Sequence, residues 1–259
     1  MHLRNSNVLI TGGASGLGEA TARLALHHGA KVCIIDLHEL AKKTIEHKFH
    51  DRFLSLLADV TVPKDIETAI GKMIEVFGSV DVVVNCAGIA PVGKTVGKFE
   101  GEYGPHDLAL FEKTVKINLV GSFNVARLAA FAMERNQPNE VGERGLIINT
   151  ASIAAYDGQM GQVAYAASKG GVASMTLPMA RDLSRAGIRV MTIAPGLFET
   201  PMMAGLPQEA QGSLGEQVPF PPRLGKPAEY AQLVKSIVEN PMLNGEVIRL
   251  DGALRMGPR

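Results

Sequence analysis

A tyrosine and a lysine lie four residues apart in the stretch AYAASKGGVASM, residues 164–175. In a helix, Tyr165 and Lys169 would share one face, because residues i and i+4 are neighbours there. A free tyrosine has a pKa of about 10 and is a poor base at neutral pH, but a nearby ammonium favours the phenolate. The spacing predicts a tyrosine that exchanges a proton with a substrate hydroxyl. Taken alone, such a spacing is also typical of solvated surface residues.

Two polar residues upstream extend this set. Ser152 follows the apolar run GLIINT, and we expect its hydroxyl to bind the substrate oxygen beside Tyr165. Asn118 is a polar residue in the apolar helical stretch VKINLVGSFNV, where it could hold a water that links Lys169 to solvent. The predicted catalytic residues are therefore Asn118, Ser152, Tyr165 and Lys169.

A glycine-rich turn, TGGASGLG, follows the first apolar run of the chain and precedes a helical segment. Side chains at Gly12, Gly16 or Gly18 would block the approach of backbone N–H groups and a helix N-terminus to a pyrophosphate. A glycine triplet alone is a weak signal, but its place between a strand and a helix predicts a dinucleotide-binding turn.

The second apolar run, KVCIID, ends at Asp36, and no lysine or arginine follows it until Lys42. A carboxylate here can accept hydrogen bonds from both adenosine ribose hydroxyls and would repel a 2′-phosphate, which predicts NAD rather than NADP. A solvated carboxylate at a strand end is the alternative. We expect Asp59, which ends the run RFLSLLAD, to receive the adenine amino group. The small residues of NCAG, residues 85–88, would let the backbone pass close to the ribose.

Short apolar runs alternate with helical segments along the chain. Runs without polar alternation are typical of strands buried on both faces, as in parallel sheets. The pattern predicts one α/β domain over residues 1–259, a doubly wound parallel sheet of about seven strands with helices on both faces. The expected strands lie within 7–11, 31–36, 52–60, 80–88, 145–152, 188–196 and 245–252, with helical segments at 19–30, 38–49, 63–78 and 164–175.

Two glycine- and proline-rich regions, residues 89–111 and 196–230, interrupt this alternation. Both follow expected strands, and open α/β sheets bind ligands beyond the carboxyl ends of their strands. We expect at least one region to shape a substrate pocket, although both could be plain surface loops.

The composition narrows the class of protein. The 259 residues are 46% hydrophobic, which supports one large core, and 26 basic residues balance 26 acidic ones. A net charge of zero argues against nucleic acid or a membrane surface as the main partner, although a local basic patch stays possible. The two cysteines and the residue spacings suggest neither a disulfide framework nor a metal site. No secretory leader or long apolar span is visible, so we expect a cytoplasmic location, or the mitochondrial matrix in a eukaryote.

The motifs together resemble the short-chain dehydrogenase/reductase family. TGxxxGxG, NCAG, the Asn118 segment, Ser152 and Tyr165-xxx-Lys169 occur in the family's order and spacing along nearly the whole chain. The resemblance implies a Rossmann-like single domain, a nicotinamide cofactor and catalysis by the four predicted residues. NCAG departs mildly from the commoner NNAG, because Cys86 replaces the second asparagine.

Further stretches, among them IRVMTIAPGLFETPMM and NPMLNGEVIRLDGALRM, resemble the 3-hydroxyacyl-CoA dehydrogenases of this family. That resemblance implies oxidation of (S)-3-hydroxyacyl-CoA to 3-ketoacyl-CoA with NAD, in fatty-acid or branched-chain acyl-CoA catabolism. It implies that PGLFETP, residues 195–201, carries the nicotinamide. The implied NAD contacts, with those of the turn and NCAG, are Gly12, Ser15, Gly16, Leu17, Gly18, Asp36, Asp59, Val60, Cys86, Ala87, Gly88, Tyr165, Lys169, Pro195, Phe198 and Thr200.

The substrate and partner contacts are less specific. Gln159 and Gln162 would line the acyl pocket with Ser152 and Tyr165, or be ordinary loop amides. Lys94 and Lys98 could meet the CoA phosphates, although solvated surface lysines are more typical of such a region.

The thin, small-residue helix at 164–175 would let another backbone approach closely. The family resemblance implies that it packs against a partner subunit in a homotetramer. Three alternative functions stay open: a dehydrogenase of free secondary alcohols or hydroxysteroids, a ketoacyl carrier-protein reductase, which Asp36 disfavours, and a non-catalytic partner subunit, for instance in an RNA-processing assembly.

Overall fold

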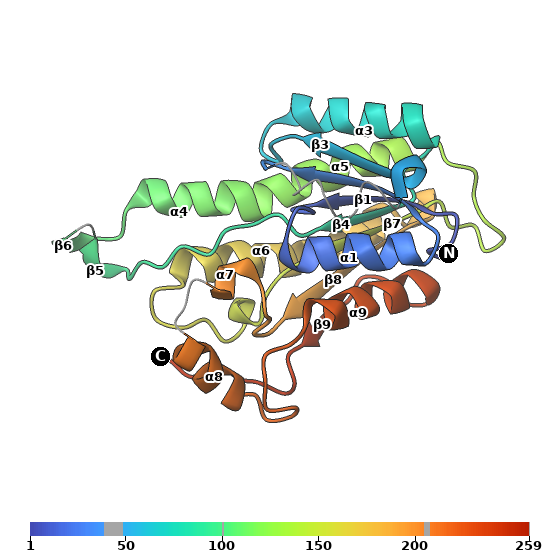
Figure 1. The fold of residues 1–259 in the computed structure, drawn as a ribbon. Helices are drawn as coiled ribbons and strands as arrows, with labels where there is room; N and C mark the ends of the chain where they lie inside the picture. Colours follow the sequence, from blue (N-terminus) through green and yellow to red (C-terminus); the bar gives the residue numbers. More distant parts are fainter. Residues whose placement is uncertain (39–48, 100, 205–207, 259) are drawn as a thin grey trace.

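Seven parallel strands form the central sheet (Figure 1). The structure is a computed structural model and describes residues 1–38, 49–99, 101–204 and 208–258. The strand order is β3-β2-β1-β4-β7-β8-β9, so the chain winds outward from β1 in one direction and then, from β4, in the other. The predicted doubly wound sheet is confirmed. Its strands are β1 (Asn7–Thr11), β2 (Lys31–Asp36), β3 (Phe53–Leu57), β4 (Val82–Asn85), β7 (Gly145–Thr150), β8 (Ile188–Pro195) and β9 (Val247–Leu250).

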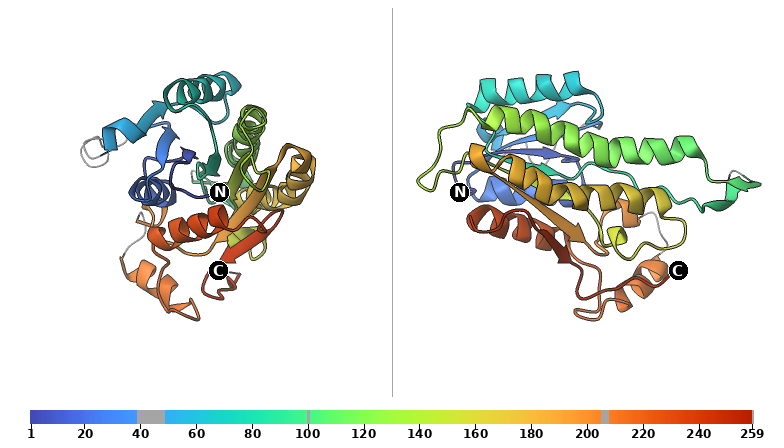
Figure 2. Two further views of the ribbon diagram at one scale, coloured as in Figure 1. Left: turned by 90° about the vertical axis from the view of Figure 1, so that its right-hand side faces the viewer. Right: turned by 180° about the vertical axis from the view of Figure 1, so that it is seen from behind.

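The helices form one layer on each face of the sheet (Figure 2). Helices α1 (Gly16–His27) and α9 (Pro227–Glu239) cover one face, and α3 (Pro63–Phe77), α5 (Ser122–Met133) and α6 (Val163–Asp182) cover the other. Strand residues alternate between the two cores: Val8 and Ile10 pack with α1 and α9, whereas Leu9 packs with the opposite layer. Burial on both faces explains why the strands read as continuous apolar runs.

The ends of two helices have local causes. Helix α3 begins with Pro63, a favourable first residue, and ends before Gly78, whose φ of 98° is the left-handed conformation of a helix stop. At the start of α9, the Glu229 carboxylate reaches back to accept a hydrogen bond from the Lys226 backbone N–H at 2.7 Å. The helical segment expected at 38–49 falls almost entirely outside the described residues.

The two regions expected as loops contain regular structure. Region 89–111 holds an antiparallel hairpin, β5 (Val96–Phe99) and β6 (Glu102–Pro105), and the start of α4 (Leu108–Val115). The hairpin projects beyond the end of α4, away from the sheet (Figure 1). Region 196–230 contains two short helices, α7 (Pro201–Ala204) and α8 (Gln208–Glu216), and the first turn of α9. The sequence did not predict these elements, because the glycines and prolines of the two regions are typical of loops.

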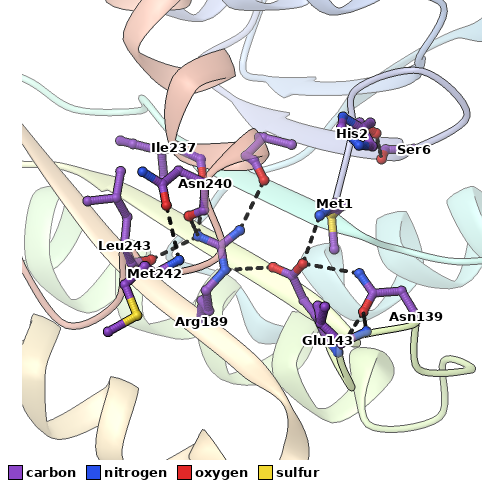
Figure 3. Close-up of polar contacts among 12 residues, drawn as sticks. Met1, His2, Ser6, Asn139, Glu143, Arg189, Ile237, Asn240, Met242 and Leu243 are labelled. Atoms are coloured by element: carbon purple, nitrogen blue, oxygen red, sulfur yellow. Dashed lines mark hydrogen bonds and ion pairs between the residues drawn. The ribbon is translucent and has the colours of Figure 1, made fainter.

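A buried ion pair between Arg189 and Glu143 lies at the start of β8, at the end of the sheet opposite the glycine turn. Figure 3 shows its hydrogen bonds. Arg189, at the start of β8, donates to Glu143 at 2.6 Å. It also donates to the backbone carbonyls of Ile237 and Val238 in the last turn of α9 and of Asn240 and Leu243 just after it. Both charged side chains are under 10% exposed. The guanidinium thus satisfies the last carbonyls of α9 and joins that helix to the sheet.

Two negative findings hold for the described residues. Their helices include none that is long and apolar enough to cross a membrane. They also include no group of three His, Cys, Asp or Glu side chains placed to hold a metal ion.

Candidate active site

The glycine turn lies where the chain leaves β1 and enters α1. Gly12 has a φ of 64°, and a Cβ there would come within 2.8 Å of the Ala87 backbone nitrogen. A Cβ on Gly18 would lie 2.2 Å from the Gly12 carbonyl oxygen. Only glycine permits these approaches of backbone to backbone, so the turn can hold the end of β4 and the start of α1 together.

The N-terminus of α1 is open for an anion. Ser15 is the N-cap residue, but its side chain makes no capping hydrogen bond. Gly16 has a φ of 54°, and a Cβ there would lie 3.5 Å from the Thr200 side chain, so the segment after β8 lies against the turn. Free N–H groups at a helix start, with glycines that admit a close ligand, fit the pyrophosphate of a dinucleotide.

The two predicted carboxylates lie at the ends of strands on this edge: Asp36 is the last residue of β2, and Asp59 comes shortly after β3. Asp36 accepts hydrogen bonds from the backbone N–H groups of Ala14, at 3.0 Å, and His38, at 3.1 Å, and is half-buried. Each of its oxygens keeps a lone pair for a ribose hydroxyl. Asp59 accepts from the Thr61 N–H at 2.8 Å, and Val60 beside it is buried.

Lys169 is buried in α6, with only 4% of its surface exposed. Its Nζ donates to the Thr150 backbone carbonyl at 2.7 Å and lies 5.8 Å from the centre of the Tyr165 ring. Burial lowers the pKa of Lys169 to about 8, while the nearby Cys86 thiol acts in the opposite direction. The structure therefore brings the predicted lysine and tyrosine together at the end of β7.

Tyr165 shows a departure from the sequence-based expectation. Burial raises the pKa of its phenol, and a hydrogen bond with Ser152 partly lowers it. The expected lowering by Lys169 does not dominate here, because the phenol is desolvated and the ammonium is directed at the Thr150 carbonyl. Ser152 itself is buried, and its Oγ accepts from the Ala154 N–H at 3.1 Å.

Asn118 lies in a π-helical segment, Lys116–Gly121, between α4 and α5. Its Oδ1 accepts from the Ile89 N–H at 2.8 Å, and its Nδ2 donates to the Ile89 carbonyl at 2.8 Å and to Ser168 Oγ at 2.9 Å. Both amide hydrogens are thus used within the protein, and Asn118 joins the segment after β4 to α6. One Oδ1 lone pair is left for the expected water, so the relay stays a prediction.

Comparison with known proteins agrees with this geometry. Residues 6–211 match the profile of the family described as short chain dehydrogenase. The chain belongs to the short-chain dehydrogenase family. It is 54% identical over 250 residues to a human protein named 3-hydroxyacyl-CoA dehydrogenase type-2, covering 96% of this chain and 95% of the relative.

Two further relatives carry the same name. The Drosophila melanogaster protein is 51% identical over 256 residues, covering 99% of this chain and all of the relative. A crystal structure of the enzyme so named from Mycobacterium avium has a TM-score of 0.92 and 41% identity, with 98% of each chain covered. The predicted family and fold are confirmed.

In this short-chain dehydrogenase, the segment after β8 lies beside the glycine turn. Pro195 and Phe198 are buried, and a Cβ on Gly225 would lie 2.8 Å from the Phe198 ring. The contacts of Pro195, Phe198 and Thr200 with a nicotinamide stay predictions. So do those of Leu17, Ala87 and Gly88, which border the same turn and the end of β4.

The predicted substrate-side residues are held by the chain itself. Gln159 Nε2 donates to the Gly257 carbonyl at 3.2 Å, and Gln162 Oε1 accepts from the Gln159 N–H at 3.0 Å. Both are half-buried loop amides, and their contact with an acyl chain stays a prediction. Lys94 and Lys98 are exposed on the region 89–111.

Sequence analysis missed two residues of the site. Thr150 supplies the carbonyl that accepts from Lys169, and its side-chain oxygen lies 2.7 Å from the buried Tyr230 hydroxyl of α9. A backbone carbonyl has no residue-type signal, and Tyr230 lies in a plain amphipathic helix. The Cys86 thiol, 3.6 Å from the Thr150 hydroxyl, has its pKa raised by burial.

Proposed function

We propose that this short-chain dehydrogenase oxidises (S)-3-hydroxyacyl-CoA to 3-ketoacyl-CoA with NAD. The proposal depends above all on one observation: the buried Lys169 and Ser152 and the half-buried Tyr165 lie together at the sheet edge that also carries the glycine turn. The substrate class comes from the relatives named 3-hydroxyacyl-CoA dehydrogenase type-2, which share about half their residues with this chain over nearly its full length.

The chain's own residues move the proton. Ser152 orients the substrate hydroxyl, and Tyr165 takes its proton as the carbonyl forms. Because burial raises the pKa of Tyr165, the Lys169 ammonium is needed to favour the phenolate. The nicotinamide of NAD, when bound at the glycine turn, would supply the acceptor for the hydride that leaves the substrate carbon. Asn118 holds the segment that follows β4 against α6, which keeps Lys169 in place.

Asp36 supports NAD over NADP. Its carboxylate lies beside the glycine turn and bonds to the Ala14 N–H, so a 2′-phosphate on the adenosine ribose would meet a negative charge. The turn supports a dinucleotide, since Gly12 and Gly18 leave no room for a Cβ.

The first test is NADH formation from (S)-3-hydroxybutyryl-CoA, measured with NAD and separately with NADP. We expect rapid turnover with NAD, far slower turnover with NADP, and a fall of about 10²–10⁴-fold in kcat for Tyr165→Phe. Full activity of Tyr165→Phe would overturn the mechanism. If the protein oxidises free secondary alcohols or hydroxysteroids but no acyl-CoA, the proposed substrate class is wrong. If it binds no NAD, the non-catalytic role is favoured.

A homotetramer is part of this proposal. Apart from its own helical turn, the described part of the chain places no atom within 4 Å of a Cβ on Gly170 of α6. Leu108, Phe123 and Leu177 are exposed on α4, α5 and α6. The neighbouring Gly171 has a different reason to be glycine, which lies within the chain: a Cβ there would come within 2.6 Å of the Leu119 side chain. Light scattering should give four chains of 27.5 kDa; a monomer at micromolar concentration would refute the assembly. A cytoplasmic or matrix location stays a prediction.

A further inference from the structure

A buried group of three polar side chains lies behind the proposed catalytic lysine. Tyr230 of α9 is 0% exposed, and its hydroxyl lies 2.7 Å from Thr150 Oγ1 and 3.7 Å from Cys86 Sγ. The Thr150 hydroxyl is in turn 3.6 Å from that sulfur. The three residues come from α9, the end of β7 and the residue after β4, so the group joins three elements at one point.

Thr150 connects this group to the site. Its side chain contacts Tyr230 and Cys86, while its backbone carbonyl accepts from Lys169 Nζ at 2.7 Å. Among the described residues, that carbonyl is the one hydrogen-bond acceptor recorded for Lys169. The position of Thr150 therefore sets the position of the ammonium.

Packing alone does not account for the Tyr230 hydroxyl. Its ring lies in the apolar core between α1, α9 and the sheet, with Val234 and Ile237 on the same helix. A phenylalanine would fill the same space without burying a hydroxyl, which costs free energy unless it is hydrogen-bonded. Within the described structure, the recorded partners of this hydroxyl are Thr150 and Cys86, both next to Lys169.

We propose that Tyr230 is a positioning residue for Lys169, acting through its hydrogen bond to Thr150. The inference rests on the proposed function, in which the Lys169 ammonium favours the Tyr165 phenolate. By fixing the Thr150 side chain, Tyr230 keeps the Thr150 carbonyl directed at Nζ and the ammonium beside the phenol.

The expected consequence follows from the groups that face Lys169. These are Tyr165 on its own helix, Cys86 after β4 and the Thr150 carbonyl of β7. The carbonyl favours the charged lysine, whereas burial lowers its pKa to about 8. If Thr150 is released, the pKa of Lys169 falls further and the phenolate loses support. The acid limb of the rate profile then moves to higher pH.

The test compares Tyr230→Phe, Thr150→Val and Thr150→Ser with the wild type. We expect Tyr230→Phe and Thr150→Val to lower kcat about three- to tenfold, the effect of one lost hydrogen bond, with KM for the acyl-CoA nearly unchanged. The acid limb of the kcat profile should rise by about half a unit, and Thr150→Ser should restore both values.

The control is Thr176→Val. It removes a buried hydroxyl–hydroxyl bond elsewhere in the core, the 2.6 Å bond between Thr176 of α6 and Thr192 of β8. It should lower the Tm without moving the pH profile. A Tyr230→Phe protein that loses stability but keeps the wild-type kcat and pH profile would overturn the proposal. If that variant does not fold, equal profiles for Thr150→Val and Thr150→Ser would overturn it instead.

A measurement without substrate separates this inference from the proposed function. The ¹³Cε shift of Lys169 in lysine-labelled protein reports its titration directly, and Tyr230→Phe should move that titration to lower pH. An unmoved titration refutes the positioning role. A wild type that oxidises no secondary alcohol refutes the proposed function, whatever the titration shows.

Discussion

At the scale of single residues, burial disfavours the charged forms of Lys169 and Tyr165 that the proposed reaction uses. A lysine 4% exposed is costly to keep charged, and a desolvated tyrosine resists ionisation. Lys169 offsets part of this cost through the Thr150 carbonyl. The protein thus holds a destabilising charge where the proposed reaction uses it.

Replacing Lys169 by methionine tests how much the buried charge lowers the free energy of unfolding. The pKa of Lys169 falls from 10.5 to about 8 on folding, so between these values the unfolded chain binds more protons and stability rises with pH. Below pH 8 the full cost applies, about 3 kcal/mol. We expect Lys169→Met to raise the free energy of unfolding at pH 7 by about 1–3 kcal/mol, reduced by the unpaired carbonyl, and to abolish the rise above pH 8.

Urea denaturation at pH 7 and at pH 10 measures both effects, and kcat should fall at least about a hundredfold in the same variant. Lys64→Met, at a side chain that is 83% exposed, is the matched control and should leave stability and kcat nearly unchanged. A Lys169→Met protein less stable than the wild type at pH 7 would contradict the argument.

At the scale of elements, the glycine turn is a packing requirement as much as a binding site. Gly18 lies so close to Gly12 that a Cβ would be 2.2 Å from a carbonyl oxygen, which no side-chain movement relieves. By contrast, a Cβ on Gly71, in the middle of α3, would meet no described atom within 4 Å beyond its own helical turn. The two helical glycines therefore predict opposite effects for one and the same substitution.

Gly18→Ala should lower the Tm and weaken NAD binding, because the start of α1 must move away from β1. Gly71→Ala should raise stability by about 0.5–1 kcal/mol, the helix propensity of alanine over glycine, and leave NAD binding unchanged. Thermal unfolding and NAD titration of both variants check this. Equal destabilisation by the two would refute the steric account of the turn.

At the scale of the whole molecule, the two edges of the sheet have different tasks. The carboxyl ends of β1, β2, β4, β7 and β8 carry the proposed site, because parallel strands bring these ends to one edge. At the other edge, Arg189 and Glu143 fix the end of α9 to the sheet (Figure 3). Stability and chemistry are therefore separated along the strands.

Arg189→Leu should reveal this separation. Removing Arg189 leaves the buried Glu143 with the Met1 ammonium, 3.0 Å away, as its countercharge. The cost is therefore below the about 3–5 kcal/mol of a fully unpaired buried charge, and α9 also loses bonds to its last carbonyls. We expect a clearly lower Tm, with kcat at 25 °C within about twofold of the wild type. The double variant Arg189→Leu/Glu143→Leu should regain part of the stability. A large loss of kcat in the folded single variant would contradict the separation.

The sequence by itself determined the strands of the central sheet and the residue types at their ends. The runs at 7–11 and 31–36 match β1 and β2 residue for residue, because strands buried on both faces must be continuously apolar. The signals for the family and the proposed cofactor depend only on residues that are close in sequence. These signals are the glycine triplet, Asp36 at the end of its strand, and the spacing of Tyr165 and Lys169, so the sequence was enough to predict both.

Only the tertiary structure decided which groups meet. Tyr230 contacts Thr150 across 80 positions of sequence, and Asn118 bonds to the Ile89 backbone; backbone carbonyls and amides look alike at every position, so no residue type marked them. The hairpin in 89–111 and the helices in 196–230 were hidden by glycine and proline. Whether the pKa of Tyr165 is raised or lowered depends on burial, which exists only after the chain has packed.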